Sequence, residues 1–139
     1  MKYKFAKMLA ATAMAFSIQA ALADDAPKMA KGILVDAAGR TLYTFDADRE
    51  GKSSCNDRCT MYWPPALATG TTPSSRDLSI IVREDGTDQW AFQGMPLYRF
   101  SGDTQPGEVN GDDRGGAWHA IRSPLPRASR SVPTSPYGH

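Results

Sequence analysis

The sequence predicts a small, mainly β single domain of two β-hairpin or meander repeats, with one short helix near a pair of cysteines. Three observations support this prediction. The pattern Gly-x-x-Leu-Tyr-x-Phe-x-x-Asp occurs at residues 39–48 and again at residues 94–103, with a constant offset of 55 residues. Its alternating aromatic residues are typical of a strand, in which successive side chains point to opposite faces. Glycine-containing turn signals separate the apolar runs.

The two ends of the chain are expected to lie outside this domain. Lysines at positions 2, 4 and 7, an apolar run and the ending Ala21-Leu22-Ala23 predict a secretory signal peptide at residues 1–23. The apolar run is shorter than the about 20 residues that a membrane-spanning helix needs. Residues 123–139 contain four prolines and four serines and predict a disordered tail. We therefore expect one domain at residues 24–122, periplasmic or secreted, and soluble after signal-peptide cleavage.

Removing the two ends reverses the sign of the net charge. The whole chain has 16 basic and 15 acidic residues, whereas residues 24–122 have 11 basic and 15 acidic residues, a net charge of −4. A nucleic-acid partner therefore lacks electrostatic support. If the domain binds a partner by charge, we expect a cation or a component of the cell envelope.

The first repeat, at about residues 32–68, predicts a strand, a tight turn and a second strand. The apolar run at 33–35 is followed by a turn that ends at Gly39, and then by a strand that carries Tyr43 and Phe45 on one face. Two aromatic side chains on one face bury a large apolar area and therefore favour core formation. Asp48 begins the next loop, where its carboxylate is expected to accept backbone N–H bonds.

The second repeat, at about residues 87–122, carries the matching motif, and three strands are expected at 78–83, 89–92 and 96–100. The same offset of 55 residues relates Trp63 to Trp118, which we interpret as equivalent core side chains. The predicted core of the two repeats is therefore Tyr43, Phe45, Asp48, Trp63, Tyr98, Phe100, Asp103 and Trp118.

Cys55 and Cys59 are the only cysteines in the sequence. In an exported protein, two cysteines so close together predict a disulfide first. The alternative is a reduced pair that binds a soft metal such as Cu(I), with help from Met61 and His119, or that takes part in thiol redox chemistry. A short helix at about residues 56–62 is expected to bring the two cysteines onto neighbouring turns.

Residues 46–57 repeat part of the spacing of a calcium-binding loop, with acidic residues at positions 1, 3 and 5 and Gly51 at position 6. The match is incomplete, because the twelfth residue is an aspartate, Asp57, and the preceding element is a predicted strand. We therefore interpret this segment as a solvated acidic loop.

Together, these motifs resemble a bacterial family of secreted repeats, described as predicted lipoproteins with a Yx(FWY)xxD motif. The resemblance covers about residues 31–122 and rests on both motif copies, the cysteine pair and the segment Trp63-Pro64-Pro65. The family generally has no assigned function, so the resemblance implies an architecture and no activity. The signal-peptide cleavage point lacks the cysteine that a lipid anchor requires, so a soluble periplasmic form is expected.

The sequence offers little material for catalysis. His119 is the one histidine between residues 24 and 122, and no Gly-x-Ser-x-Gly motif surrounds a serine. We expect His119 to be a strand-surface residue with a hydrogen-bond partner. The predicted function is a non-enzymatic periplasmic binding or structural module of unknown ligand. The alternative is a copper-handling or thiol-redox protein that uses Cys55 and Cys59, and copper is the one cofactor that either hypothesis implies.

Overall fold

A computed structural model describes residues 25–70, 72–73 and 75–123. The predicted signal peptide and residues 124–139 of the predicted tail lie outside the described residues. Within them the protein is mainly β with one short α-helix, which confirms the predicted fold class. No helix in the described part of the chain has the length and apolar character needed to cross a membrane.

The first repeat begins with the antiparallel hairpin of β1 (Lys28–Ala30) and β2 (Ile33–Val35). The next turn closes on the predicted Gly39, whose φ of 82° lies in the left-handed region that glycine adopts without strain. In the same turn, the Asp36 carboxylate accepts N–H bonds from Ala38 and Arg40, both at 2.9 Å. β3 (Tyr43–Phe45) follows and carries the first motif.

The helix α1 (Cys59–Tyr62) is shorter than the predicted segment 56–62. Asp57 has a φ of 51°, a left-handed conformation that cannot continue into a right-handed helix. The helix therefore begins only after this residue, and its cap N–H at Trp63 bonds to the Cys59 carbonyl oxygen.

The second repeat forms a three-stranded antiparallel sheet of β4 (Leu78–Val82), β5 (Asp88–Phe92) and β6 (Met95–Pro96). β6 is shorter than the predicted strand 96–100, because Tyr98 leaves this sheet and forms bridges with Tyr43 and Pro65 of the first repeat. A short 3₁₀ helix, η1 (Arg114–Gly116), leads into β7 (Trp118–Ala120).

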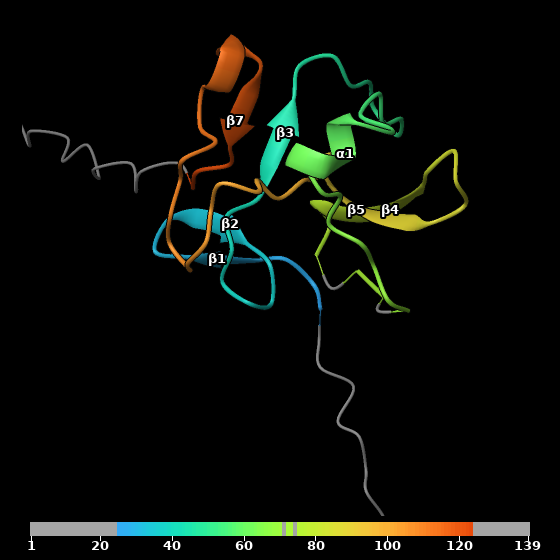
Figure 1. The fold of residues 1–139 in the computed structure, drawn as a ribbon. Helices are drawn as coiled ribbons and strands as arrows, with labels where there is room; N and C mark the ends of the chain where they lie inside the picture. Colours follow the sequence, from blue (N-terminus) through green and yellow to red (C-terminus); the bar gives the residue numbers. More distant parts are fainter. Residues whose placement is uncertain (1–24, 71, 74, 124–139) are drawn as a thin grey trace, which may run out of the picture.

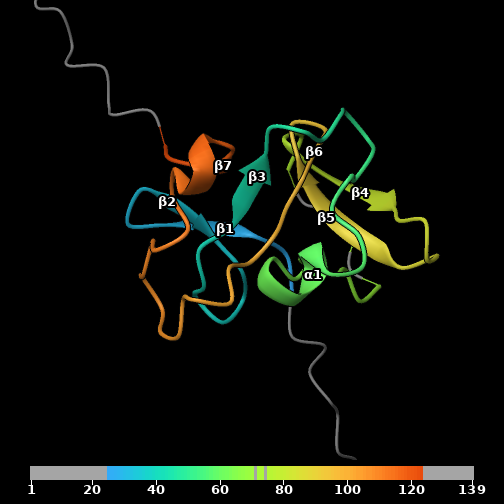
Figure 2. The same ribbon diagram turned by 45° about the horizontal axis from the view of Figure 1, so that its top comes forward.

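The centre of the domain combines strands from both repeats (Figures 1 and 2). β3 pairs with β7 in an antiparallel register that places Thr44 opposite His119 and Phe45 opposite Trp118. Tyr43 and Tyr98 exchange two backbone hydrogen bonds, of 2.8 and 2.9 Å. Neither repeat therefore forms this central pairing by itself.

Two apolar clusters fill the interior. The first consists of aliphatic side chains packed with the ring of Trp90, and it includes Leu34, Leu42 and Leu97. The second is aromatic and contains the motif side chains together with Cys55, and its buried members are Tyr43, Cys55, Trp63, Tyr98, Phe100 and Trp118. The aromatic cluster lies where the two repeats meet, and it is the part of the fold that organises the motif residues.

Candidate functional site

Four motif rings form one continuous stack across the boundary between the repeats. The rings of Trp63 and Trp118 are parallel to within 1°, with centroids 3.8 Å apart. Phe45 of the first repeat stacks on Trp118 of the second at 4.2 Å, and Phe100 of the second repeat packs against Trp63 of the first at 4.5 Å. Each phenylalanine therefore contacts the tryptophan of the other repeat. Gly111 permits this close packing, because a Cβ there would lie 2.8 Å from the Trp63 ring.

The motif tyrosines and aspartates are exchanged in the same way. The Tyr43 hydroxyl donates a hydrogen bond to Asp103 Oδ2, and the Tyr98 hydroxyl donates one to Asp48 Oδ2, both at 2.6 Å. The second oxygen of each carboxylate accepts a loop N–H, from Asn110 for Asp103 and from Ser54 for Asp48. Each carboxylate thus closes its own loop and holds the tyrosine of the opposite repeat.

Burial keeps the two tyrosine hydroxyls of these hydrogen bonds protonated. Burial, followed by the bond to Asp103, raises the pKa of Tyr43 well above its ordinary value. Burial and the bond to Asp48 raise the pKa of Tyr98 in the same direction. Both phenols therefore keep their protons and act as donors. The pKa of Asp48 is also raised, since burial outweighs the bonds from Tyr98 and Ser54 and the charge of Arg83.

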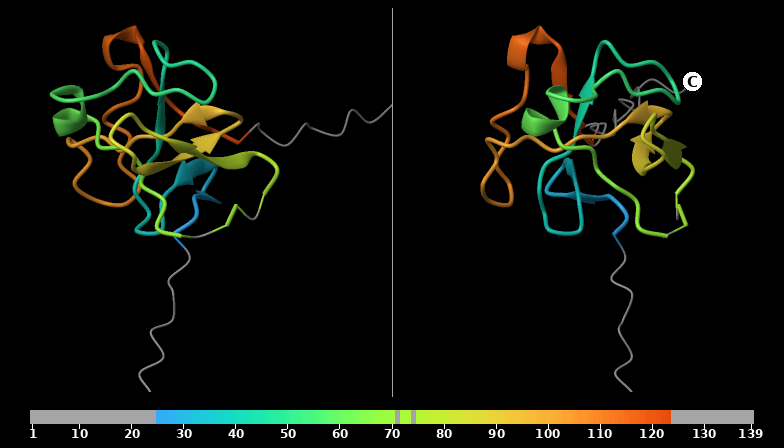
Figure 3. Two further views of the ribbon diagram at one scale, coloured as in Figure 1. Left: turned by 90° about the vertical axis from the view of Figure 1, so that its right-hand side faces the viewer. Right: turned by 45° about the vertical axis from the view of Figure 1, so that its right-hand side comes forward.

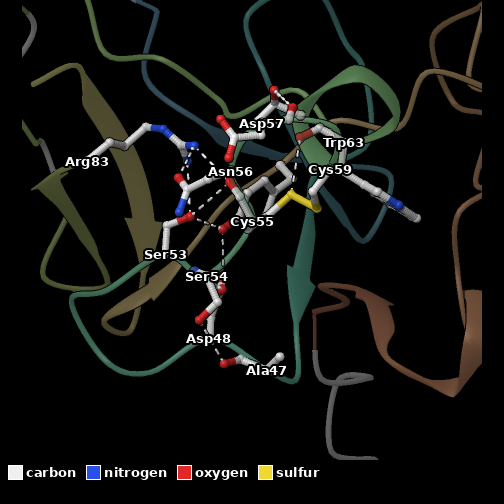
Figure 4. The surroundings of a disulfide bond; sticks show 12 residues. Ala47, Asp48, Ser53, Ser54, Cys55, Asn56, Asp57, Cys59, Trp63 and Arg83 are labelled. Carbon is white, nitrogen blue, oxygen red and sulfur yellow. Dashed lines mark hydrogen bonds between the residues drawn. A yellow bond between two sulfur atoms is a disulfide. The ribbon is translucent and has the colours of Figure 1, made fainter. Parts of the chain in front are cut away.

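A buried arginine, Arg83, lies beside Ser53 and the disulfide loop (Figure 4). Arg83 is 6% exposed, and its Nη1 donates to Ser53 Oγ at 3.1 Å and to Gln89 Oε1 at 2.8 Å. The Ser53 and Tyr98 hydroxyl oxygens are 2.6 Å apart, and Ser53 is the donor because Tyr98 gives its proton to Asp48. Two hydroxyl groups therefore connect the buried guanidinium to the buried carboxylate. Such a charge-assisted chain is stronger than its neutral equivalent.

The disulfide loop supplies the other acceptors of this arginine. Cys55 and Cys59 form a disulfide with a Cα–Cα distance of 5.3 Å, which confirms the predicted pairing. Arg83 Nη2 donates to the Cys55 carbonyl oxygen at 2.8 Å and to Asn56 Oδ1 at 3.0 Å. The disulfide therefore fixes the loop that caps the guanidinium (Figure 4).

Removing the disulfide, by a Cys55→Ser/Cys59→Ser double substitution, is expected to lower the free energy of unfolding by about 2 kcal/mol. The value is at the low end for disulfides because the closed loop is so short. Urea unfolding of both proteins gives the difference. A thiol titration of the denatured wild-type protein is expected to find no free thiol, and two free thiols would contradict the pairing.

The four residues of the copper hypothesis occupy different settings. Both cysteine sulfurs are consumed in the disulfide, and the Met61 side chain is exposed on α1. His119 lies on β7, where its Nε2 is 2.9 Å from Asp46 Oδ2. In residues 25–70, 72–73 and 75–123, no group of three or more His, Cys, Asp or Glu side chains is placed to hold a metal ion.

The segment that resembles a calcium loop has another role. Asp48 points into the core, with both carboxylate oxygens bonded to Ser54 and Tyr98, and Asp46 is bonded to His119. The acidic positions therefore diverge from one another. In this segment, one carboxylate is part of the aromatic core and another lies on the surface.

His119 is a half-exposed strand residue whose pKa is raised, chiefly by its hydrogen bond to Asp46 and also by the charges of Asp113 and Asp112. A raised pKa in the folded state adds stability that is complete below the unfolded-state pKa of about 6.5. This stability is lost as the pH rises through the folded-state pKa. Its size is expected to be at most about 0.5 kcal/mol, because solvent screens the pair. NMR titration of the His119 ring is expected to show a pKa above that of an Asp46→Asn variant, and equal values would contradict the assignment.

Two adjoining surface cavities form a groove beside the central strands, which we call the Phe92 groove. The cavities have volumes of about 370 Å³ and about 500 Å³ and share Phe92, Ile121 and Arg122 as lining residues. Met29, Leu34 and Leu78 add apolar walls to the first cavity, and Met95 adds one to the second. Lys28 and Arg122 place two cationic side chains at the first cavity, where Asp77 provides one carboxylate. The first cavity therefore combines apolar lining residues with Lys28, Arg122 and Asp77, and Arg122 is also paired with Asp112 at 2.7 Å.

Sequence reasoning did not identify the partners of the motif residues, Arg83 or the Phe92 groove. Only the offset of 55 residues hinted at the exchange, because two identical motifs are able to pack about a common axis. Arg83 follows an apolar strand and precedes a turn, which is the usual setting of a solvated arginine. The groove combines five separate stretches of the chain, at residues 27–34, 44, 75–78, 92–95 and 121–123, and no single stretch signals it.

A family model for a secreted repeat of unknown function matches the chain twice, at residues 25–67 and 79–122. Each match contains one copy of the Tyr-x-Phe-x-x-Asp motif and its tryptophan, so the two matched units are the halves that exchange side chains in the aromatic core. Searches of curated proteins and of solved structures returned no match. The chain belongs to this family of secreted repeats.

Proposed function

We propose that the protein is a non-enzymatic binding module of the cell envelope, exported to the periplasm, and that its ligand occupies the Phe92 groove. The observation that carries the proposal is that the motif side chains are engaged in bonds inside the fold. The motif tyrosines and aspartates, the cysteines and Arg83 are each bonded to one another or to the chain around them. Because these groups hold the fold together, we assign ligand binding to side chains on the surface.

The chemistry of the groove favours an amphiphilic ligand. An elongated apolar body is able to extend along Phe92 and Ile121, which line both cavities. An anionic end is favoured near Lys28 and Arg122, although Arg122 already bonds Asp112 at 2.7 Å. Binding sites of this kind commonly have mostly apolar walls and a few polar groups that orient the ligand.

The proposal is tested with 1-anilinonaphthalene-8-sulfonate, an apolar fluorophore with an anionic group. We expect the folded protein to show saturable fluorescence enhancement. A Met29→Glu substitution, which introduces an anion at a 45% exposed groove position, is expected to weaken this binding at least about tenfold. Val82→Glu is the matched control, because Val82 is 70% exposed on β4 and lines neither cavity of the groove. The proposal fails if the wild type gives no saturable signal or if both variants weaken it equally.

A further inference from the structure

The interface between the two repeats is self-complementary. Each characteristic contact occurs twice, with the repeats in exchanged roles: the Tyr43–Asp103 and Tyr98–Asp48 hydrogen bonds, and the Phe45–Trp118 and Phe100–Trp63 ring contacts. The Trp63–Trp118 stack lies between them. This is the contact pattern of an isologous interface, in which one surface meets its own equivalent across a twofold axis.

The described residues between the two repeats contribute little to this interface. The connection comprises residues 69–77, and its described residues, 69–70, 72–73 and 75–77, run along the outside of the domain (Figure 3). Thr69 bonds Asp25 within its own repeat, and the Asp77 carbonyl oxygen accepts the Gln93 N–H within the other. Neither bond joins one repeat to the other.

The connection is longer than closure within one chain requires. Ala68 bonds Asp88 on one edge of β5, whereas Leu78 pairs with Phe92 on the other edge. Four residues along a strand and two strand spacings across the sheet separate these points by about 16 Å. Nine connecting residues span up to about 33 Å. The connection is therefore longer than the distance that it spans. Each repeat can pack either against the other repeat of its own chain or against the equivalent repeat of a second chain.

We propose that the surface by which each repeat meets the other also fits a second copy of this chain, so that two chains pair by reciprocal exchange of one repeat when the connection cannot close within one chain. The monomer and the exchanged dimer contain the same contacts, so the balance between them depends on the connection. A short connection gives the attached repeat an effective concentration in about the millimolar range. The natural chain is therefore monomeric at micromolar concentration, and a chain whose connection cannot span the domain pairs with a second copy.

A series of three connections tests this proposal. Deletion of residues 69–76 leaves one residue between Ala68 and Leu78, which spans at most about 7 Å and cannot bridge the separation. Light scattering at micromolar concentration is expected to give twice the monomer mass for the deletion variant. The natural chain, and a variant with eight Gly/Ser residues inserted after Gly70, are expected to give the monomer mass. Near-ultraviolet circular dichroism from the stacked tryptophans is expected to be the same in all three proteins.

An engineered cross-link distinguishes exchange from other kinds of dimer. Thr44 and His119 face each other on β3 and β7, so a T44C/H119C pair joins the two repeats. In the natural connection, oxidation is expected to produce a cross-linked monomer, whereas in the deletion background it is expected to produce a covalent dimer. The proposal is overturned if the deletion variant is a folded monomer, if it is unfolded, or if its dimer shows no cross-link between chains.

Discussion

Replacing Trp63 by alanine is expected to lower the free energy of unfolding by about 3–5 kcal/mol, the range for removing a large buried aromatic side chain. Trp63 is 8% exposed, and its ring touches Trp118, Phe100 and Tyr43. A domain of this size is stable by only about 5–15 kcal/mol. The substitution therefore removes a large share of the total stability.

The twofold arrangement makes a sharper prediction. Trp118→Ala is expected to have nearly the same effect, because Trp118 is 7% exposed and has the equivalent neighbours Trp63, Phe45 and Tyr98. The double variant is expected to lose less than the sum, since each single substitution already removes the Trp–Trp contact. Urea unfolding of the three variants provides the comparison. Tyr62→Ala is the control, because this ring is 63% exposed and its loss is expected to cost less than about 1 kcal/mol. Clearly unequal effects of the two tryptophans would contradict their equivalence.

Arg83→Met is expected to lower the free energy of unfolding by about 3–5 kcal/mol, as when one partner is removed from a buried charged network. Four uncharged acceptors lose their donor: Ser53 Oγ, Gln89 Oε1, the Cys55 carbonyl oxygen and Asn56 Oδ1. Methionine fills much of the volume but satisfies none of these groups. Arg83→Lys is expected to recover only part of the loss, because an ammonium group cannot reproduce the planar fork of the guanidinium.

A second readout separates the charge of Arg83 from its packing. This charge lowers the pKa of Asp48, whereas burial of the carboxyl raises it. The pKa of Asp48, followed by NMR, is therefore expected to rise further in Arg83→Met. Arg76→Met is the control, because Arg76 is exposed, and its effect on stability is expected to stay within about 0.5 kcal/mol. An unchanged Asp48 pKa in Arg83→Met would contradict the electrostatic coupling between Arg83 and Asp48.

Local patterns in the sequence were enough to predict the fold class. The motif glycines lie in turns, with Gly39 and Gly94 both at a φ of 82°, because only glycine adopts this conformation without strain. The disulfide was predictable, because two cysteines four residues apart in an exported chain have few other uses. Each of these features depends on residues that are close together in the sequence.

The pairing of the motif residues was not predictable in the same way. Asp48 lies five residues after Tyr43, yet it bonds Tyr98, fifty residues away. The motif has the same form in both copies, so a local pattern cannot tell which aspartate receives which phenol. The burial of Arg83 depends likewise on acceptors 27 and 28 residues away at Asn56 and Cys55. These pairings, and the burial of Arg83, are determined by the packing of the two repeats against each other.

The central claim is that the tyrosine of each motif bonds the aspartate of the motif in the other repeat. Double-mutant cycles of unfolding free energy test this claim most directly. The Tyr43→Phe/Asp103→Ala and Tyr98→Phe/Asp48→Ala cycles are expected to give coupling energies of about 1–3 kcal/mol. The Tyr43→Phe/Asp48→Ala and Tyr98→Phe/Asp103→Ala cycles are expected to give less than about 0.5 kcal/mol, because these side chains share no hydrogen bond in the described part of the chain. Larger coupling within a repeat than between repeats would contradict the exchanged core.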